Sequence, residues 1–204
     1  MDTTVITTET YDQHWADLED YHRLRHDIFV SVGGLGRTDL YAAAGQETDI
    51  WDLPHFGPAH FLVRHEGRAV AVGRMTSSIM PTMMDVLYPE FVDGNIPNDQ
   101  NIWEVQRLGV APDLSPVLRE IALSNVLIAM ERFSFRHRIH QLMLLTFVGI
   151  AKKRLTDMTP MGPVCQHLGF PHIAVIGTPD PALHASRRRE LAKFEASIIQ
   201  EKAA

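Results

Sequence analysis

The chain alternates between two spacings of apolar residues. Apolar positions three to four residues apart predict helices at residues 11–32, 81–88, 115–135, 149–157 and 183–202. Short apolar runs bounded by turn residues predict strands at residues 60–65, 69–77, 101–110, 141–148, 164–168 and 172–176. Residues 33–58 are rich in glycine and proline and follow neither spacing. A hairpin followed by alternating strands and helices predicts the α/β class, with a mixed sheet flanked by helices in one three-layer domain over residues 1–204.

The predicted strand at residues 101–110 carries two charges, Glu104 and Arg107, among apolar residues. A charge inside a buried strand is costly unless it is paired, so partners must come from elsewhere in the chain. The candidates are four charged residues in distinctive settings: Arg25, Asp49, Asp52 and Arg74. The three arginines and three acids balance in formal charge, and we expect all six to converge on one cleft.

The geometry of a regular strand conflicts with this expectation. Residues three apart in a strand face opposite sides, so Glu104 and Arg107 should diverge. If both serve one cleft, a β-bulge or a strong bend is predicted near Val105 and Gln106.

A balanced set of charges can hold a zwitterion. Carboxylates bind an ammonium or sulfonium group, and a guanidinium binds a carboxylate. An α-amine has a pKa of about 8 when free, and a base such as Glu104 could deprotonate it to make a nucleophile. The alternative is an ion network with a purely structural role, and spacing alone favours neither.

Composition narrows the possible partners. The net charge of −6 argues against nucleic acid. The single cysteine, Cys165, excludes a disulfide framework and indicates a reducing compartment. The first residues lack the features of a secretory signal, and no apolar run reaches the length of about 20 residues that spans a membrane. We therefore expect a cytoplasmic protein. The histidines show no third ligand beside any pair, so no metal site is expected.

Five motifs follow one another along the chain: Arg25-x-x-x-Phe29, Glu47-x-Asp49-x-x-Asp52, Arg74 after the hairpin, Pro81-Thr-Met-Met84 and Trp103-Glu104-x-x-Arg107. In this order they resemble those of the autoinducer synthases that make acyl-homoserine lactones. The resemblance covers about residues 8–178 and leaves the predicted C-terminal helix, 183–202, outside it. Residues 22–29 and 81–84 are most similar to the branch that uses short branched or aryl acyl groups carried on coenzyme A.

The resemblance implies an acetyltransferase-like α/β/α sandwich with two substrates and no cofactor. S-adenosylmethionine would supply the amine, and an acyl thioester on coenzyme A or acyl carrier protein would supply the acyl group. Acyl transfer and lactone closure would release methylthioadenosine. The catalytic residues would be Glu104, Arg107 and Arg74. The substrate-binding residues would be Arg25, Phe29, Asp49, Asp52, Trp103 and Thr146.

The chain departs from the family where a tryptophan usually follows Leu-Gly, because Leu35-Gly36 is followed here by Arg37. Trp51 or Tyr41 could supply the missing aromatic wall. A second hypothesis assigns a basic group, Lys152, Lys153 and Arg154 with Arg136 and Arg138, to an acidic carrier protein or to the phosphates of coenzyme A. A solvated helix face explains these charges equally well.

Two other functions fit the same architecture. A coenzyme A-dependent N-acetyltransferase would carry a glycine-rich phosphate loop after the central strand, and residues 111–118 contain no glycine. A non-enzymatic domain would only bind a small ligand in the charged cleft. For a synthase, Glu104→Ala and Arg107→Ala should abolish lactone formation. Glu104→Ala should also lower stability by about 3–5 kcal/mol, because the loss of one member of a buried ion pair leaves the other unpaired.

Overall fold

The computed structural model describes residues 1–32, 42–43, 45–154 and 158–203. Its centre is an eight-stranded sheet in the order β1-β4-β5-β6-β7-β10-β8, with β9 paired to β10. Neighbouring strands are antiparallel except β6 and β7, which are parallel. The strands are β1 (Asp2–Thr7), β4 (Ala59–His65), β5 (Arg68–Ser77), β6 (Ile102–Val110), β7 (Gln141–Phe147), β8 (Thr159–Pro160), β9 (Cys165–His167) and β10 (Phe170–Gly177). A separate pair is formed by β2 (Ala42–Ala43) and β3 (Gln46–Glu47).

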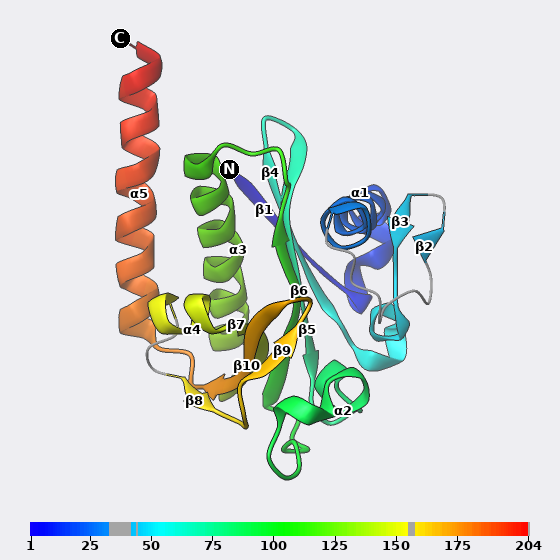
Figure 1. The fold of residues 1–204 in the computed structure, drawn as a ribbon. Coiled ribbons are helices and arrows are strands. Elements are labelled where there is room, and N and C mark those ends of the chain that lie inside the picture. Colours follow the sequence, from blue (N-terminus) through cyan, green and yellow to red (C-terminus); the bar gives the residue numbers. More distant parts are fainter. Residues whose placement is uncertain (33–41, 44, 155–157, 204) are drawn as a thin grey trace.

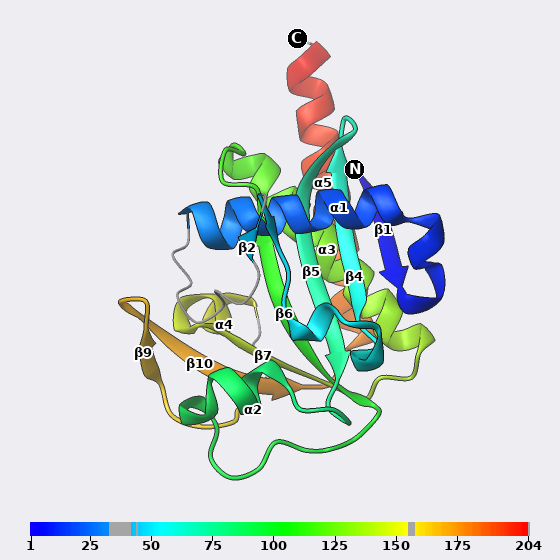
Figure 2. The same cartoon turned by 90° about the vertical axis from the view of Figure 1, so that its right-hand side faces the viewer.

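Helices cover both faces of this sheet, as Figures 1 and 2 show. One face carries α1 (Trp15–Arg25), which continues into the π-helix η2 (His26–Val32), and α2 (Met83–Leu87). The other face carries α3 (Pro116–Arg136), α4 (Val148–Arg154) and α5 (Pro181–Ala203). Short 3-10 turns are η1 (Thr8–Gln13), η3 (Ile50–Asp52), η4 (Pro54–Phe56) and η5 (Pro89–Phe91). The helix predicted from residue 11 therefore begins later, because Thr8–Gln13 forms a separate turn.

The hydrophobic core lies on both sides of the sheet. Phe61, Val105, Met130 and Phe133 belong to the cluster between the sheet and α3, and Leu24 belongs to the cluster under α1. A fully buried side chain of this size contributes about 1.5–3 kcal/mol. The helix α3 begins where the sequence predicts, because the Ser115 side chain accepts a hydrogen bond from Leu118 N and Pro116 occupies the first turn.

The last helix adds a layer outside the three that the sequence predicts. In Figure 1, α5 lies against the outer side of α3 and not against the sheet. Leu191 packs on Ile121 and Ile128 of α3. The buried carboxylate of Glu131 pairs with His184, and also with Arg187. None of the described helices is long and apolar enough to cross a bilayer.

A β-bulge interrupts β6 one to two residues after the predicted place. Arg74 on β5 lies opposite Gln106, but Val72 lies opposite Gly109, so Arg107 and Leu108 together face Gly73. Arg107 has a φ of 51°, in the left-handed region. Such a conformation costs about 1–3 kcal/mol in a non-glycine residue and persists only where the surroundings hold it. Gln106 shares the face of Glu104 by regular alternation, and the bulge brings Arg107 to that side as well, which confirms the predicted bend.

The two parallel strands part next to this bulge. The pairing of β6 with β7 ends at Val105 and Leu144, although β6 continues to Val110 and β7 to Phe147. Figure 2 shows β7 and β10 running away from the upper half of β6. Among the described residues no strand pairs with the facing edges there, and an extended ligand can pair with such backbone groups.

Candidate active site

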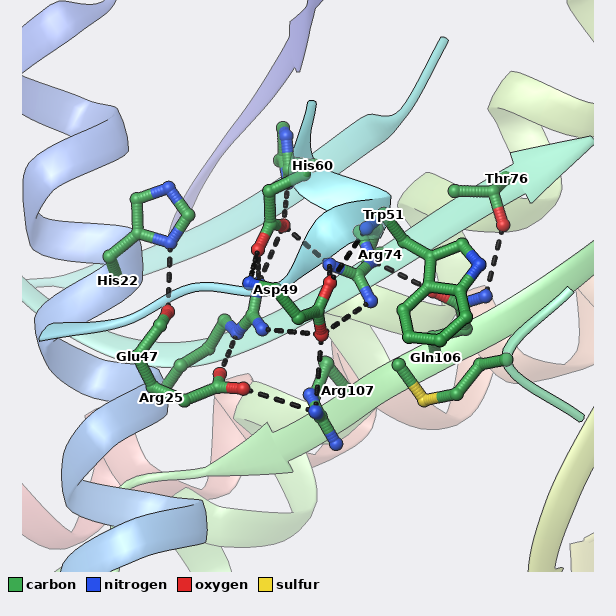
Figure 3. Close-up of polar contacts among 12 residues, drawn as sticks. His22, Arg25, Glu47, Asp49, Trp51, His60, Arg74, Thr76, Gln106 and Arg107 are labelled. Carbon is green, nitrogen blue, oxygen red and sulfur yellow. Dashed lines mark hydrogen bonds and ion pairs between the residues drawn. The ribbon is translucent and has the colours of Figure 1, made fainter. Parts of the chain in front are cut away.

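Six charged side chains meet on the α1 side of the sheet, and Figure 3 labels five of them. We call this set the ion cluster. The arginines come from the end of α1, from β5 and from the bulge of β6, and the acids come from β3 and from residues 49–52. All six side chains are at least nine-tenths buried, and their formal charges cancel. The members are Arg25, Arg74, Arg107, Glu47, Asp49 and Asp52.

Asp49 is the centre of the ion cluster. Its carboxylate accepts hydrogen bonds from Arg25 Nη2 at 3.2 Å, from Arg74 Nη1 at 2.6 Å and from Arg107 Nη2 at 3.1 Å. Asp49 also caps the η3 turn, because its Oδ1 accepts from Trp51 N at 3.0 Å. Burial alone raises the pKa of Asp49, but the neighbouring guanidiniums outweigh burial and hold the pKa below its ordinary value. Asp49 is therefore charged at neutral pH.

Asp52 completes the pairing of two arginines. Arg25 Nη1 donates to both of its oxygens, at 2.7 and 2.9 Å, and Arg74 Nη1 also donates to Oδ1. Burial raises the pKa of Asp52, but Arg25 and Arg74 hold it well below its ordinary value. The pair Asp49 and Asp52 faces inward because Asp52 Oδ2 accepts from Asp49 N at 2.8 Å, which closes a capping box around the turn.

A neutral histidine lies behind the ion cluster. His60 Nε2 is 2.9 Å from the hydroxyl of Tyr11, and its ring contacts the Tyr21 ring edge-on at 4.8 Å. Burial lowers the pKa of His60 to about 3. His60 therefore adds no cation to the site at neutral pH.

Of the three arginines in the ion cluster, Arg107 has a donor without a partner in the described part of the chain. Every guanidinium nitrogen of Arg25 and Arg74 donates to at least one oxygen. Arg107 Nε, in contrast, is buried without a hydrogen-bond partner among the described residues. Its guanidinium carbon lies 5.6 Å from the centre of the Phe29 ring, which belongs to the π-helix. Gly109 permits this approach, because a Cβ there would lie 3.1 Å from the Phe29 ring.

Glu104 lies beside the ion cluster and not within it. Its carboxylate accepts from Met83 N at 2.8 Å and Met84 N at 3.1 Å, at the start of α2. Within the described part of the chain it forms no ion pair. Burial raises the pKa of Glu104 to about 7, because the hydrogen bonds from Gln106 and Met83 offset only part of the desolvation.

The expectation that Glu104 pairs with the arginines is therefore wrong, and Glu47 takes the sixth place. Glu47 binds Arg25 Nε and lies 3.1 Å from Arg107 Nη2. The sequence carried a signal for it, since Glu47 alternates with Asp49 in the same acidic motif. Gln106 is a second residue that the sequence reasoning missed. Its amide contacts both Arg74 and Glu104, and an uncharged residue in an apolar strand gave no comparable signal.

The other predicted site residues are divided between the two faces of the sheet. Phe29 borders the ion cluster. Trp103 packs on Phe133 of α3, with 5.6 Å between ring centres, on the opposite face. Thr146 is buried on β7 and alternates with Leu142 and Leu144, which face α3. The structure thus separates Trp103 and Thr146 from the charged residues.

The sequence also led to expectations about an aromatic wall, a basic group and a metal site. Trp51 is 1% exposed, packs in a core cluster with Met83 and Met84, and donates from Nε1 to Pro81 O. The suggestion that Trp51 forms an aromatic wall stays a prediction. Arg37 and Tyr41 lie outside the described residues, as do the side chains of the predicted basic group at 152–154. The described residues contain no group of three or more potential ligands that could hold a metal ion.

Comparison with known proteins places the chain in a family. The family model described as autoinducer synthase matches residues 9–156. The coenzyme A-dependent acyl-homoserine lactone synthase BjaI, solved with S-adenosylmethionine and isopentyl-CoA, superposes with a TM-score of 0.79 at 22% identity, over 92% of this chain and 88% of that one.

Two further solved structures share the fold. The coenzyme A-dependent synthase MesI gives a TM-score of 0.77 at 23% identity, over 94% of this chain and 95% of that chain. The acyl-homoserine lactone synthase LasI gives 0.75 at 22% identity, over 88% and 90%. No curated protein sequence matches. The family match covers most of the chain, and the superpositions confirm the predicted α/β/α sandwich, so this chain belongs to the autoinducer synthase family.

Proposed function

We propose that this acyltransferase acylates the α-amine of S-adenosylmethionine from an acyl thioester, with Glu104 as the base, and then closes the product to an acyl-homoserine lactone. The observation that carries the proposal is the contrast at one site between a neutral, buried ion cluster and a buried carboxylate that forms no ion pair within the described part of the chain. Glu104 is 3% exposed and has a pKa of about 7. A general base is most effective when its pKa lies near the working pH.

The charges of the site suit this substrate. S-adenosylmethionine carries an ammonium, a sulfonium and a carboxylate, so its net charge is +1. The ion cluster is neutral and the ionised Glu104 adds −1. The carboxylate of the substrate fits Arg107, whose Nε lacks a partner among the residues that the structure describes. The Phe29 ring beside that guanidinium offers a face to the sulfonium. Arg25, Asp49, Asp52 and Arg74 hold this arrangement in place.

The parted strands suit the acyl donor. The edges of β6 and β7 beyond Val105 and Leu144 offer backbone groups to the amides of a pantetheine arm. We assign coenzyme A as the carrier, since BjaI and MesI are coenzyme A-dependent synthases of the same fold. Trp103 and Thr146 lie on the α3 side of this opening, where they suit the acyl group rather than adenosylmethionine.

The reaction then has two steps. Glu104 takes a proton from the ammonium, and the amine nitrogen attacks the thioester carbon. The carbon–sulfur bond of the thioester breaks, and the coenzyme A thiolate leaves and takes up a proton. In the second step a carboxylate oxygen attacks the carbon beside the sulfonium. That carbon–sulfur bond breaks, which yields the lactone and neutral methylthioadenosine. No metal or other cofactor enters either step, and the cytoplasmic location expected from the sequence stays a prediction.

The test is incubation of the purified chain with S-adenosylmethionine and a panel of short branched, aryl and straight acyl-CoA thioesters. Methylthioadenosine and an acyl-homoserine lactone, both detected by mass spectrometry, support the proposal. Free thiol without methylthioadenosine would indicate an N-acyltransferase for another amine, and neither product would indicate a binding domain. A parallel extract from a host that expresses the chain identifies the acyl group. Turnover that survives treatment with a chelator supports the absence of a metal.

A further inference from the structure

Gln106 lies between the ion cluster and Glu104. In the antiparallel pair of β5 and β6, Arg74 lies opposite Gln106 and Thr76 lies opposite Glu104. These four side chains alternate along the two strands and therefore share one face of the sheet. Gln106 is 4% exposed, so its amide must find its hydrogen-bond partners within the protein.

The partners determine which way the amide of Gln106 points. Arg74 Nε is 2.8 Å from one end of the amide, and a guanidinium can only donate, so that end is the oxygen Oε1. The nitrogen Nε2 then faces the opposite way. It donates to Glu104 Oε2 at 2.5 Å and to Thr76 Oγ1 at 3.0 Å. A flip of the amide would place its NH₂ group against the donor of Arg74, so this orientation is unique.

The two oxygens of Glu104 consequently differ. Oε2 accepts from Met83 N and from Gln106 Nε2, which uses both of its lone pairs. Oε1 accepts from Met84 N alone among the described residues. We propose that Gln106 is a positioning residue that occupies Oε2 of Glu104 and so reserves Oε1 for the proton of the substrate amine. This inference rests on the function proposed above.

Gln106 also connects the base to the adenosylmethionine site. A continuous chain of buried hydrogen bonds runs from Asp49 through Arg74 and Gln106 to Glu104. Because the amide donates to the carboxylate, it favours the charged form of Glu104 and works against desolvation. Loss of that donor makes the carboxylate harder to ionise and frees it to rotate about its own axis.

The first experiment compares Gln106→Met with Thr76→Val through the pH profile of kcat/KM for methylthioadenosine release. Gln106→Met keeps the length of the side chain and removes the amide. We expect the acid limb of the profile to move to higher pH, so that kcat/KM falls about tenfold on the acid side of the wild-type limb. In alkali the loss of kcat/KM should be smaller, because only the orientation of the ionised carboxylate is then affected. Thr76→Val removes the other partner of Nε2 and leaves Glu104 its donor, so its profile should match that of the wild type.

A second variant covers the case in which Gln106→Met does not fold. Gln106→Glu still offers an oxygen to Arg74, but places a negative charge against Glu104. Its acid limb should move to higher pH by at least as much. A loss of rate that is equal at every pH, or an unshifted acid limb in both variants, overturns the proposal.

A third measurement needs no turnover. Infrared titration of the free protein follows the protonated carboxyl of Glu104, assigned by its absence in Glu104→Gln. We expect the protonated band to persist to higher pH in Gln106→Met than in the wild type, and an unchanged titration overturns the role of Gln106. If the wild type makes no lactone while the infrared shift is present, the proposed function fails and the positioning of Glu104 by Gln106 stands.

Discussion

The ion cluster and the Glu104 carboxylate lie on the same face of the same strands, yet burial has opposite consequences for them. Asp49 and Asp52 are surrounded by guanidiniums, so their pKa values stay low in spite of burial. Glu104 is equally buried, but its hydrogen-bond donors among the described residues are all amides, and its pKa rises to about 7. Buried charges that are paired are fixed charges, whereas a buried carboxylate without a cation can exchange its proton at neutral pH.

We therefore expect the ion cluster and Glu104 to have different tasks. The ion cluster attaches residues 47–52 to the sheet and carries no net charge, and Arg107 Nε has no partner among the described residues. In the proposed reaction, Glu104 supplies the reactive group. If this division is correct, variants of the two regions should differ in kind: one set should affect stability and binding, and the other turnover.

The largest expected effect is that of Glu104→Gln on turnover. Removal of a positioned base should lower kcat for methylthioadenosine release by about 10²–10⁴-fold. Adenosylmethionine should still bind, because Glu104 forms no ion pair within the described chain. Steady-state kinetics and calorimetry measure the two quantities. A rate within about tenfold of the wild-type rate would remove Glu104 from the mechanism.

Arg107→Ala should weaken the binding of adenosylmethionine. It removes the guanidinium that we propose binds the substrate carboxylate, and with it the side chain that packs on Phe29. We expect lactone formation to be abolished, chiefly through lost binding, with a loss of at least about 100-fold in kcat/KM, as for a truncated partner of a buried charge pair. Arg68→Ala, which removes an exposed partner of Asp113, is the matched control and should keep wild-type kinetics. Wild-type affinity for adenosylmethionine in Arg107→Ala would contradict the assignment.

Asp49→Asn should affect the fold more than the base. Asp49 is the common acceptor of three arginines, and its neutralisation leaves a buried excess of positive charge. The free energy of unfolding should fall by about 3–5 kcal/mol, measured by urea denaturation. Asp113→Asn breaks an exposed pair with Arg68 and should leave the denaturation midpoint unchanged. A midpoint for Asp49→Asn equal to that of the wild type would show that the ion cluster does not stabilise the fold.

The pH dependence of stability should show a smaller effect of Glu104. Its pKa is 4.5 in the ordinary state and about 7 in the fold, so the folded state binds the proton more tightly. The corresponding stability is fully present below pH 4.5 and is lost as the pH rises through about 7. The loss is about 3 kcal/mol. Urea denaturation at several pH values should show this decline in the wild type. In Glu104→Gln the decline of stability with pH should be weaker. A decline identical to that of the wild type would refute the raised pKa of Glu104 in the fold.

The structure also changes the reason for the expected instability of Glu104→Ala. The sequence suggested that an arginine would lose its partner. Instead, the backbone amides of Met83 and Met84 lose their acceptor, and the start of α2 loses its attachment to β6. Unsatisfied buried donors cost about 1–3 kcal/mol each. The variant is therefore still expected to be less stable than the wild type in acid, well below the Glu104 pKa of about 7, where the wild-type carboxyl is mostly protonated.

Much of the fold and part of the site can be predicted from the amino-acid sequence alone. The apolar spacings predict the hairpin β4–β5, the strand β6 and the helix α3 because local periodicity and the Ser115 cap decide those elements. The motifs led to Arg25, Asp49, Asp52, Arg74 and Arg107, which the structure brings together. The conflict between Glu104 and Arg107 in a regular strand predicted the bulge, since two charges on one face require a break in the alternation.

Only the tertiary structure decides which charges pair. Glu47 and Glu104 are both carboxylates near arginines in the motifs, and no spacing in the sequence distinguishes them. The packing of β3 against α1 brings Glu47 to Arg25, and the packing of α2 against β6 gives Glu104 two backbone amides. The amide of Gln106 likewise acquires its role from the two strands that pair around it. Residue types determine which charges must be buried, but ionisation depends on neighbours within a few ångströms, which folding selects from distant parts of the chain.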